Sequence, residues 1–385
     1  MGNLHARAAL YCGGSAVVRP LHPVGPLMNV PVSRIPVAVL GATGAVGQTF
    51  LRCLADHPWF EVTEVAASER SAGRQYGDVV RWLEGVLPDA VARQLVRPCD
   101  PAAVSAPLVF SALDSSVAGE VEAAFARAGR LVLSNARNFR MAPDVPLVIP
   151  EVNGDHLALL TRQRELRGWT GGIVTNANCA VTVVAMALAP LHAAFGVRQV
   201  MVATMQAVSG AGYPGVPSLD ILGNVIPYIG DEEPKIETEL TKLLGTLDGG
   251  AIVPAPIVTS AHANRVPVEH GHTACLSVGF ERRPTVAEAL EVLRGWRGWA
   301  AVQELPSAPQ PPLVVRDDPD RPQPRRDAMD GRGMAVTVGR VRPDPLLDLR
   351  LVAMGHNTVR GAAGGSILNA ELLVAGGLAG IGGRG

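Results

Sequence analysis

The chain has 385 residues, of which 48% are hydrophobic, and this is enough to bury one large core or two moderate ones. Its 34 basic and 35 acidic residues leave a net charge of -1. Such a balance provides no electrostatic footprint for nucleic acid or an anionic membrane surface, so we expect a small-molecule partner. No run of about 18 apolar residues is present, so no membrane span is expected.

The cysteines favour a reducing cytoplasm over an oxidising compartment. They are odd in number and show no CxxC spacing, which argues against a disulfide framework or a structural zinc site. They are Cys12, Cys53, Cys99, Cys179 and Cys275. No compact apolar core with a cleavage site is found in residues 1–34. We interpret them either as a disordered extension or as a misplaced start, with Met28 as the true initiator in the second case.

The first element predicted in chain order is a strand over Pro36 to Leu40, followed by the glycine turn Gly41 to Gly47 and an apolar-periodic helix. A strand, a glycine turn and a helix are what a phosphate-binding βαβ unit needs. GxxGxxG alone is a weak signal, since such a turn can also be a tight connection. Its place after the first strand favours cofactor binding.

The second strand is predicted over Val62 to Ala67 and leads into Ser68-Glu69-Arg70-Ser71. Two hydroxyls and an arginine suit a ribose 2'-phosphate, so we predict NADP as the cofactor. Glu69 speaks for the cofactor without that phosphate, and Arg70 could also be an ordinary surface charge.

Further strand and helix signals alternate along the first half. Strands are expected over Leu108 to Ala112 and Leu131 to Ser134, with a helix near Ala118 to Ala128 between them. This alternation predicts a doubly wound parallel sheet.

The pattern changes at about Gly172, where Ile173 to Thr175 leads into Asn176-Ala-Asn178-Cys179 and the apolar run Ala180 to Leu188. A helix that is apolar all round is a buried one. Cys179 would then lie at a helix N-terminus, where the helix dipole should lower the pKa of the thiol and backbone N–H groups could receive an oxyanion. A free cysteine is more often a core filler, which suits Cys53, Cys99 and Cys275, but we interpret Cys179 as a nucleophile.

Two nearby histidines, His270 and His272, are spaced like residues of a strand, so we expect them to point to opposite faces and only one to face a site. Such a pair could ligate zinc, but partner cysteine or carboxylate clusters are missing, so no metal is expected. His192, near the far end of the buried helix, is interpreted as a core or boundary histidine.

The C-terminal third begins with a segment rich in proline, arginine and aspartate, Pro306 to Arg326. Its composition is typical of a linker. We interpret it as an ordered excursion, because the strand predicted over Ala335 to Val341 must pair with something earlier. A final apolar helix, Ser366 to Ala375, could pack back onto the first domain.

Together these motifs resemble the aspartate-semialdehyde dehydrogenase family, in particular its archaeal and fungal branch, over about Pro36 to Ala375. The matching segments are GATGAVG (41–47), SERSAG (68–73), SNARNFRMAPDVPLVIPEVN (134–153), TNANCA (175–180), QAVSGAGYPG (206–215), DEEPKIETE (231–239), HANRVPVEHGHT (262–273) and HNTVRGAAGGSILNAE (356–371). Many motifs in the right order are more specific than any one of them.

The resemblance implies a fold and a division into domains. It implies a Rossmann-type nucleotide-binding domain of residues 35–172 and 356–385, and an α+β catalytic and dimerisation domain with a mixed sheet of residues 173–355. It also implies a cytoplasmic homodimer or homotetramer.

The resemblance further implies the roles of site residues. Cys179 would be the nucleophile, with Asn178 beside it, His272 the acid and base, and Gln206 a group that orients the substrate. Arg265 would bind the substrate α-carboxylate, Arg140 the phosphate, and Glu232 and Lys235 the amino group and phosphate, although Pro234 between them departs from the expected motif. The implied cofactor contacts are Gly41, Thr43, Gly44, Ala45, Val46, Ser68, Arg70, Ser71, Ser111, Ser209, Gly210 and Asn357.

The implied reaction is NADPH-dependent reduction of L-aspartyl 4-phosphate to L-aspartate 4-semialdehyde and phosphate through a cysteine thioester, in lysine, diaminopimelate, threonine, methionine and isoleucine biosynthesis. Alternatives with the same cysteine and histidine are malonyl-CoA or succinyl-CoA reductases and N-acetyl-glutamyl-phosphate reductase. A nucleotide-binding protein without catalysis is the alternative from another class.

Overall fold

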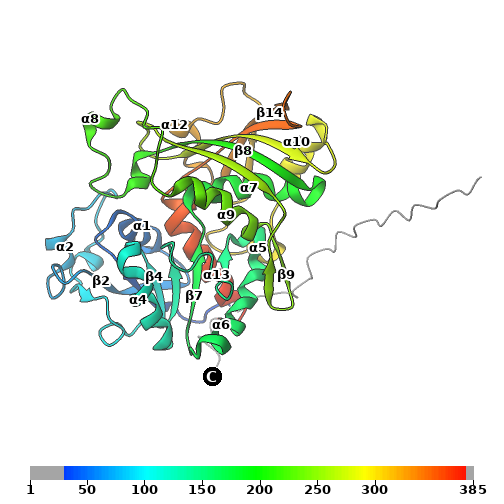
Figure 1. Ribbon diagram of the computed structural model, residues 1–385. Coiled ribbons are helices and arrows are strands. Elements are labelled where there is room, and N and C mark those ends of the chain that lie inside the picture. Colours follow the sequence, from blue (N-terminus) through cyan, green and yellow to red (C-terminus); the bar gives the residue numbers. More distant parts are fainter. Residues whose placement is uncertain (1–29, 379–385) are drawn as a thin grey trace, which may run out of the picture.

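The computed structural model describes residues 30–378, so most of the predicted extension, including Met28, lies outside the described residues. Two sheets organise these residues, a parallel sheet in the lower half of Figure 1 and a mixed sheet in the upper half. Within residues 30–378, no helix is both long and apolar enough to cross a bilayer.

The first sheet has the strand order β3-β2-β1-β4-β5-β7-β6, and its recorded pairings are parallel. Its strands are β1 (Ile35–Leu40), β2 (Phe60–Ala67), β3 (Arg97–Pro98), β4 (Leu108–Ser111), β5 (Leu131–Ser134), β6 (Leu147–Val148) and β7 (Gly172–Asn176). The order reverses at β1, which lies between β2 and β4, and the crevice at such a switch point is where open α/β sheets bind ligands. The predicted doubly wound sheet is confirmed.

Helices cover this sheet because its central strands are apolar on both faces. The longer ones that contact it are α1 (Ala45–Leu54), α4 (Ser115–Arg127), α6 (Leu159–Arg167) and α13 (Gly364–Ala375). Asp114 caps α4 by accepting a hydrogen bond from the Ser116 N–H at 2.9 Å. The predicted return of the last helix is confirmed, since α13 contacts β5 and β7.

The second sheet has the order β11-β8-β12-β15-β14-β13 and is mixed. Its strands are β8 (Val197–Gln206), β11 (Val258–Arg265), β12 (His272–Phe280), β13 (Leu313–Arg316), β14 (Val336–Pro343) and β15 (Leu349–Gly355). The outer pairs β8–β11 and β13–β14 are parallel, whereas β8–β12, β12–β15 and β14–β15 are antiparallel. A short separate hairpin joins β9 (Thr246–Asp248) and β10 (Ala251–Val253).

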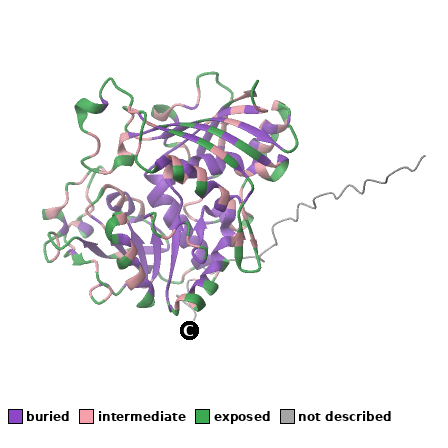
Figure 2. Ribbon diagram, viewed as in Figure 1, coloured by how far each residue is buried: buried purple, intermediate pink, exposed green. Residues whose placement is uncertain are grey.

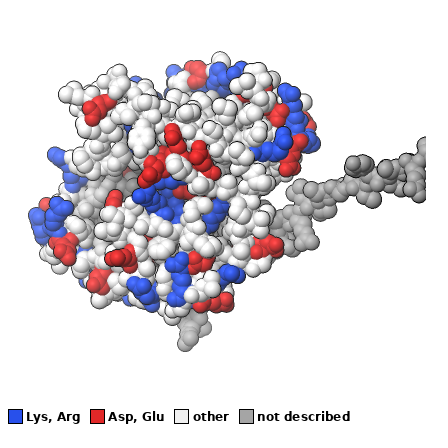
Figure 3. Space-filling view, in the orientation of Figure 1, with Lys and Arg blue, Asp and Glu red and all other residues white. Residues whose placement is uncertain are grey.

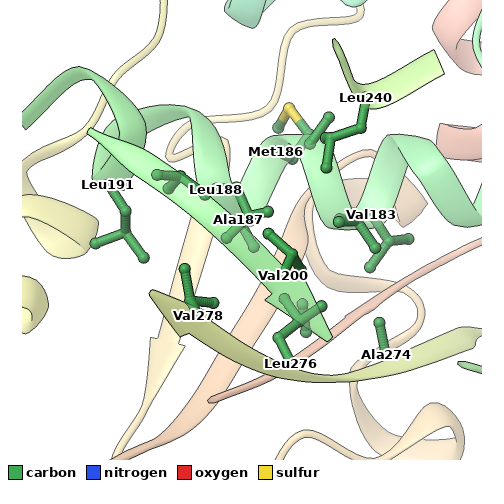
Figure 4. Packing of buried hydrophobic residues seen from close by; sticks show 14 of the residues in the cluster. Val183, Met186, Ala187, Leu188, Leu191, Val200, Leu240, Ala274, Leu276 and Val278 are labelled. Carbon is green, nitrogen blue, oxygen red and sulfur yellow. The ribbon is translucent and has the colours of Figure 1, made fainter. Parts of the chain in front are cut away.

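One face of the second sheet packs on helices, and the other is open. Its helices are α7 (Cys179–Phe195), α9 (Glu232–Leu243) and α10 (Val286–Gly295). The apolar side chains of α7, such as Val183 and Leu188, lie against Val200 of β8 and Leu276 of β12 (Figure 4). Figure 2 shows buried and exposed residues alternating along these strands, as expected for a sheet covered on one face.

The remaining helices are short connections. They are α2 (Tyr76–Val79), α3 (Asp89–Ala92), α5 (Pro150–Asn153), α8 (Ser218–Ile221), α11 (Ala300–Gln303), α12 (Pro324–Asp327), the 3₁₀ turns η1 (Gly154–Ala158), η2 (Val208–Ala211) and η3 (Asp330–Gly333), and the π-helical turn η4 (Val359–Ala363). Most are one turn long, too short to give a clear hydrophobic period in the sequence.

The structure shows where the strand β7 and the proline-rich segment lie relative to their predicted places. The strand β7 belongs to the first sheet, so this half runs past the expected end at residue 172, to Asn176. The proline-rich segment is an ordered excursion as predicted. It contains β13, which is the earlier partner that the predicted strand at Ala335 to Val341 required.

Candidate active site

Cys179 is the first residue of α7, directly after the end of β7. Asn178 caps this helix: its side-chain oxygen accepts hydrogen bonds from the N–H groups of Ala180 and Val181 at 2.9 and 3.1 Å. The capped N–H groups are therefore engaged by Asn178, and they are not free to receive an oxyanion as the sequence suggested.

The proton affinity of Cys179 also differs from the expectation. Burial and, to a smaller extent, the Glu232 carboxylate raise the pKa of the thiol to about 12, while Arg140 and Arg265 act in the opposite direction. The prediction of a lowered pKa from the helix dipole is wrong for the ligand-free protein, because desolvation of a thiolate outweighs the field of one helix end.

A cavity of about 380 Å³ opens in front of Cys179, between the two halves. It is lined by Leu113, Asp114, Ser115, Asn135, Ala136, Arg137, Arg140, Asn178, Cys179, Gln206, Gly210, Ile229, Gly230, Glu232, Lys235 and Arg265. Figure 3 shows a cluster of Lys and Arg beside a cluster of Asp and Glu in the middle of the molecule, at the level where the halves meet. The structure thus brings together the cysteine and all four predicted substrate-binding residues.

Glu232, at the start of α9, accepts hydrogen bonds from three other residues that line this cavity. Its carboxylate accepts hydrogen bonds from the Asn178 side chain at 2.9 and 3.0 Å, from Gln206 at 3.1 Å and from Lys235 at 2.9 Å. Burial raises its pKa, but Lys235 and these hydrogen bonds outweigh burial and leave the pKa below its usual value. Pro234 lies in the first turn of α9, where its missing N–H costs no hydrogen bond, so it does not interrupt the helix between Glu232 and Lys235.

Two arginines approach the cavity from different elements. Arg265, the last residue of β11, is buried and donates from Nη1 to the Ala207 carbonyl at 2.8 Å. Arg140 comes from the loop between β5 and β6, and it donates to Glu239 at 2.9 Å and to the Asn135 carbonyl at 2.7 Å. The two guanidinium groups provide separate places for two anionic groups of a ligand.

His272 begins β12 and is buried beside the cavity. Its Nδ1 accepts a hydrogen bond from the Ala207 N–H at 3.1 Å, so the neutral ring carries its proton on Nε2. Among the described residues that Nε2 has no hydrogen-bond partner. Burial, followed by the charge of Arg265, lowers the pKa of His272 to about 3, which keeps the ring neutral.

Gly210 lines the cavity and lies directly against the side chains of His272 and Arg265. A Cβ atom at this position would lie 3.0 Å from both Arg265 Nη1 and the His272 ring. The glycine therefore lets these two side chains approach the place where a ligand would lie.

A second cavity of about 400 Å³ lies next to the glycine turn that begins α1. It is lined by Ala45, Thr49, Leu83, Glu84, Val208, Ser209, Gly212, Tyr213, Pro214, Gly215, Val216, Ser218, Ile221, Leu222, Glu269, His270 and Thr358. The Ser209 hydroxyl accepts a hydrogen bond from Asn357 at 2.8 Å and lies 3.0 Å from His270 Nδ1.

The position of His270 corrects a prediction from the sequence. The strand β12 begins only at His272, and Gly271 before it has φ +100°, so the strand-like alternation does not apply. His270 lines the second cavity, and His272 is buried beside Gly210, which lines the first. His192 lies within α7 and accepts a hydrogen bond from the Val197 N–H at 3.0 Å, which confirms it as a boundary histidine.

The glycine turn fits a dinucleotide cofactor. Gly41 has φ +69°, and a Cβ there would lie 2.5 Å from the Ala112 carbonyl oxygen, while one at Gly47 would lie 2.3 Å from the Gly41 carbonyl oxygen. No side chain caps α1 at Gly44, so among the described residues its first N–H groups have no side-chain acceptor. Thr43, Ala45 and Val46 lie in the same turn, which is built to receive a phosphate.

The residues expected to select the cofactor lie in two different environments. Ser68 and Arg70 are exposed and Ser71 is half-buried after the end of β2, where a ribose phosphate can reach them. Ser111, another predicted cofactor contact, is fully buried at the end of β4.

The sequence missed two residues that support the site, Glu239 and Lys242 of α9. Both are buried, and both bind the loop that carries Arg140. Their spacing from Glu232 and Lys235 places all four on one helix face, and this periodicity was the available signal.

Two protein-family models match parts of this chain. The model of the NAD-binding domain of semialdehyde dehydrogenases matches residues 36–160, and that of their dimerisation domain matches residues 188–360.

Several curated proteins are similar to nearly the whole chain. The aspartate-semialdehyde dehydrogenase of Archaeoglobus fulgidus is 52% identical over 89% of this chain and 98% of its own length. The enzyme of that name from Cryptococcus neoformans is 48% identical over 90% of this chain and 99% of its own.

Solved structures agree with these relatives. The aspartate semialdehyde dehydrogenase of Candida albicans with NADP has a TM-score of 0.82 at 41% identity, covering 90% of this chain and all of that one. The aspartate semialdehyde dehydrogenase II of Vibrio cholerae complexed with ASA has a TM-score of 0.70 at 26% identity, covering 89% of this chain and 98% of that one.

Proposed function

The chain belongs to the aspartate-semialdehyde dehydrogenase family, and on that premise we propose that its cavity at Cys179 converts L-aspartyl 4-phosphate and NADPH into L-aspartate 4-semialdehyde, phosphate and NADP. One observation carries this proposal. A single cavity contains a cysteine nucleophile, separate arginines for two anions and a buried carboxylate for an amine.

The polar groups of the cavity match the substrate one by one. Arg265 binds the α-carboxylate and Glu232 the amino group, while Arg140 and Lys235 bind the phosphate. Glu232 also distinguishes this substrate from malonyl-CoA or succinyl-CoA, whose acyl chains have no ammonium group to neutralise a buried carboxylate.

Cys179 performs the covalent step. Its sulfur attacks the acyl carbon, the bond between that carbon and the phosphate oxygen breaks, and the thiol proton leaves with the phosphate. The product is a thioester on Cys179. NADPH, when bound, supplies the hydride that reduces the thioester carbonyl carbon.

His272 acts on the carbonyl oxygen. It donates its Nε2 proton toward this oxygen as negative charge develops there. When the carbonyl re-forms, the bond to sulfur breaks, the semialdehyde is released and Cys179 regains a proton from water. Asn178 and Gln206 hold Glu232, and through it the substrate, in place.

The cofactor is held by residues of both halves. The glycine turn from Gly41 to Val46 binds the pyrophosphate, and Ser68, Arg70 and Ser71 bind the ribose 2'-phosphate that distinguishes NADP from NAD. Ser209, Gly210 and Asn357 lie at the nicotinamide.

The open face of the second sheet is the proposed contact of a homodimer. It exposes Met201, Met205, Val258 and Cys275 in a region that matches the family's dimerisation domain. Contiguous apolar surface of this kind marks protein–protein contacts.

The test of the function is a spectrophotometric assay with aspartate semialdehyde, phosphate and NADP. We expect NADPH formation that requires phosphate, and loss of about 10⁴-fold or more in Cys179→Ala, since its nucleophile is gone. Cys53→Ala, which removes a thiol outside the cavity, should retain activity. Phosphate-dependent turnover by Cys179→Ala, or turnover only with malonyl-CoA or succinyl-CoA and NADPH, would contradict the proposal.

A further inference from the structure

One face of α9 carries four charged side chains at helical spacing: Glu232, Lys235, Glu239 and Lys242. The first two line the cavity at Cys179. The other two are buried, with exposed fractions of 2% for Glu239 and 5% for Lys242. Buried charges need partners, and the partners of Glu239 and Lys242 are parts of the site.

Glu239 joins two functional elements through one carboxylate. Oε1 accepts a hydrogen bond from Arg140 Nη1 at 2.9 Å, and Oε2 accepts one from the backbone N–H of Asn178 at 2.8 Å. Arg140 belongs to the half built on the first sheet, and Asn178 directly precedes the nucleophile at the start of α7. Both hydrogen bonds are charge-assisted, so both constrain geometry strongly.

Lys242 fixes the backbone of the same loop. Its ammonium group donates hydrogen bonds to the carbonyl oxygens of Arg140, Ala142 and Val145 at 2.7, 2.8 and 2.7 Å. With the backbone of this loop held, Glu239 and the Asn135 carbonyl together fix where the Arg140 guanidinium lies, and only Glu239 also reaches the backbone before Cys179. Arg140 also keeps a donor for a ligand, because its Nε–H has no hydrogen-bond partner within residues 30–378.

We propose that Glu239 is a positioning residue of this reaction: it holds the Arg140 guanidinium and the backbone before Cys179 at a fixed separation, so that a bound phosphate lies next to the acyl group on the sulfur. The inference rests on the proposed function. A displacement of either end would move the phosphate site relative to the nucleophile, and errors of about 1 Å in such geometry slow reactions strongly.

Two variants separate positioning from a simple effect of charge. Glu239→Gln keeps the size but loses the charge, and its amide can accept only one of the two hydrogen bonds. Glu239→Asp keeps the charge but is one methylene too short to reach both partners. If Glu239 acted only by neutralising Arg140, Glu239→Gln would bind phosphate more tightly and Glu239→Asp would resemble the wild type.

The primary readout is binding of inorganic phosphate rather than turnover. Iodoacetamide alkylates Cys179, and mass spectrometry of the peptide that contains Cys179 measures the extent of alkylation. Phosphate is then added in increasing concentration, and the protection of Cys179 from alkylation is recorded. We expect the half-protecting phosphate concentration to rise about tenfold in both variants, as for the loss of one charge-assisted hydrogen bond. In the assay, KM for phosphate should rise likewise, and KM for NADP should stay within about twofold.

The matched control is Glu237→Gln on the same helix. The Glu237 carboxylate accepts one hydrogen bond, from the Ala261 N–H at 3.1 Å, and the amide oxygen of glutamine can keep it. Its phosphate protection should equal that of the wild type. Circular dichroism and the thermal midpoint establish that each variant is folded, and Glu239→Asp carries the test if Glu239→Gln does not fold.

The outcomes separate this inference from the proposed function. The positioning role is overturned if the folded variants show the same protection by phosphate and the same KM for phosphate as the wild type. It is also overturned if Glu239→Gln binds phosphate more tightly. Either result leaves the proposed function standing. Protection of the wild type by phosphate without any turnover overturns the proposed function, and the effect of the variants on protection still tests Glu239.

Discussion

The thiol of Cys179 shows how burial and local charge compete at one residue. It stands at a helix N-terminus, which by itself favours a thiolate. Burial and the neighbouring Glu232 carboxylate are stronger and raise its pKa to about 12. Cys179 is therefore a neutral thiol at neutral pH, and the ammonium group of a substrate bound next to Glu232 would offset the effect of that carboxylate on the thiol pKa.

This balance predicts the reactivity of Cys179. Its alkylation rate by iodoacetamide, measured on the Cys179 peptide without ligands, should rise about tenfold per pH unit from pH 7 to 9, because only the thiolate reacts. Glu232→Gln should raise the rate at pH 7 while lowering turnover, since it removes a charge that raises the thiol pKa. A plateau below pH 8, or a slower rate in Glu232→Gln, would be inconsistent with this account.

At the scale of elements, α4 carries a buried carboxyl group that the reaction does not use. Glu122 has no exposed surface, and its Oε1 accepts a hydrogen bond from Ser134 at 2.8 Å at the end of β5. Burial raises the pKa of Glu122 to about 7, although the hydroxyls of Ser111 and Ser134 reduce the shift.

The raised pKa gives a signed prediction for stability. The folded state favours the protonated Glu122, so its contribution is present below pH 4.5 and is lost as the pH rises through about 7. Glu122→Gln imitates the protonated form. It should stabilise the protein by about 2 kcal/mol at pH 8, a rise of a few degrees in the thermal midpoint, and have little effect at pH 5.

Differential scanning fluorimetry at the two pH values measures this change. Glu120→Gln, on an exposed position of the same helix, is the control and should leave both midpoints unchanged. An equal shift of the midpoint at pH 5 and pH 8 in Glu122→Gln would show that the charge of Glu122 is not the cause.

At the scale of the whole molecule, the two halves are joined at the active site. The chain crosses from β7 into α7 at Asn178 and returns after β15 into α13. Arg137 and Asp231 form an exposed ion pair between the halves, with 2.5 Å between Arg137 Nη1 and Asp231 Oδ2. The helices α7 and α9 cover the face of the second sheet that is turned toward the first sheet, so the open face lies on the far side of the second sheet (Figure 1).

The proposed dimer predicts a change of mass in solution. Met201→Glu places a charge on the open face and should weaken dimerisation by about 100-fold or more, so that size-exclusion chromatography with light scattering finds a monomer at micromolar concentration. Met329→Glu, an exposed methionine outside the second sheet, should leave the dimer intact. A monomeric wild type would contradict the proposal, as would an unchanged mass of Met201→Glu.

Much of the fold could be predicted from sequence because it follows from local patterns. The apolar strands, the glycine turn before α1 and the wholly apolar α7 each appear in a short window of residues. The placement of Cys179 at the start of α7 follows from the same windows. The boundary near residue 172 was set too early, because β7 pairs with β5, a partner about 40 residues away that no local pattern identifies.

The sequence alone therefore determined the two-sheet class and the position of Cys179 at the start of a buried helix, and its motifs indicated the polar residues that line the cavity, since periodicity, glycine geometry and motif order are local properties of the chain. Only the tertiary structure decided the raised pKa of Cys179, the burial of Ser111, the place of His270 in the second cavity, and the link from Glu239 to Arg140 and Asn178. Each of these depends on burial or on a distance between residues far apart in the chain, and neither quantity exists until the chain has folded.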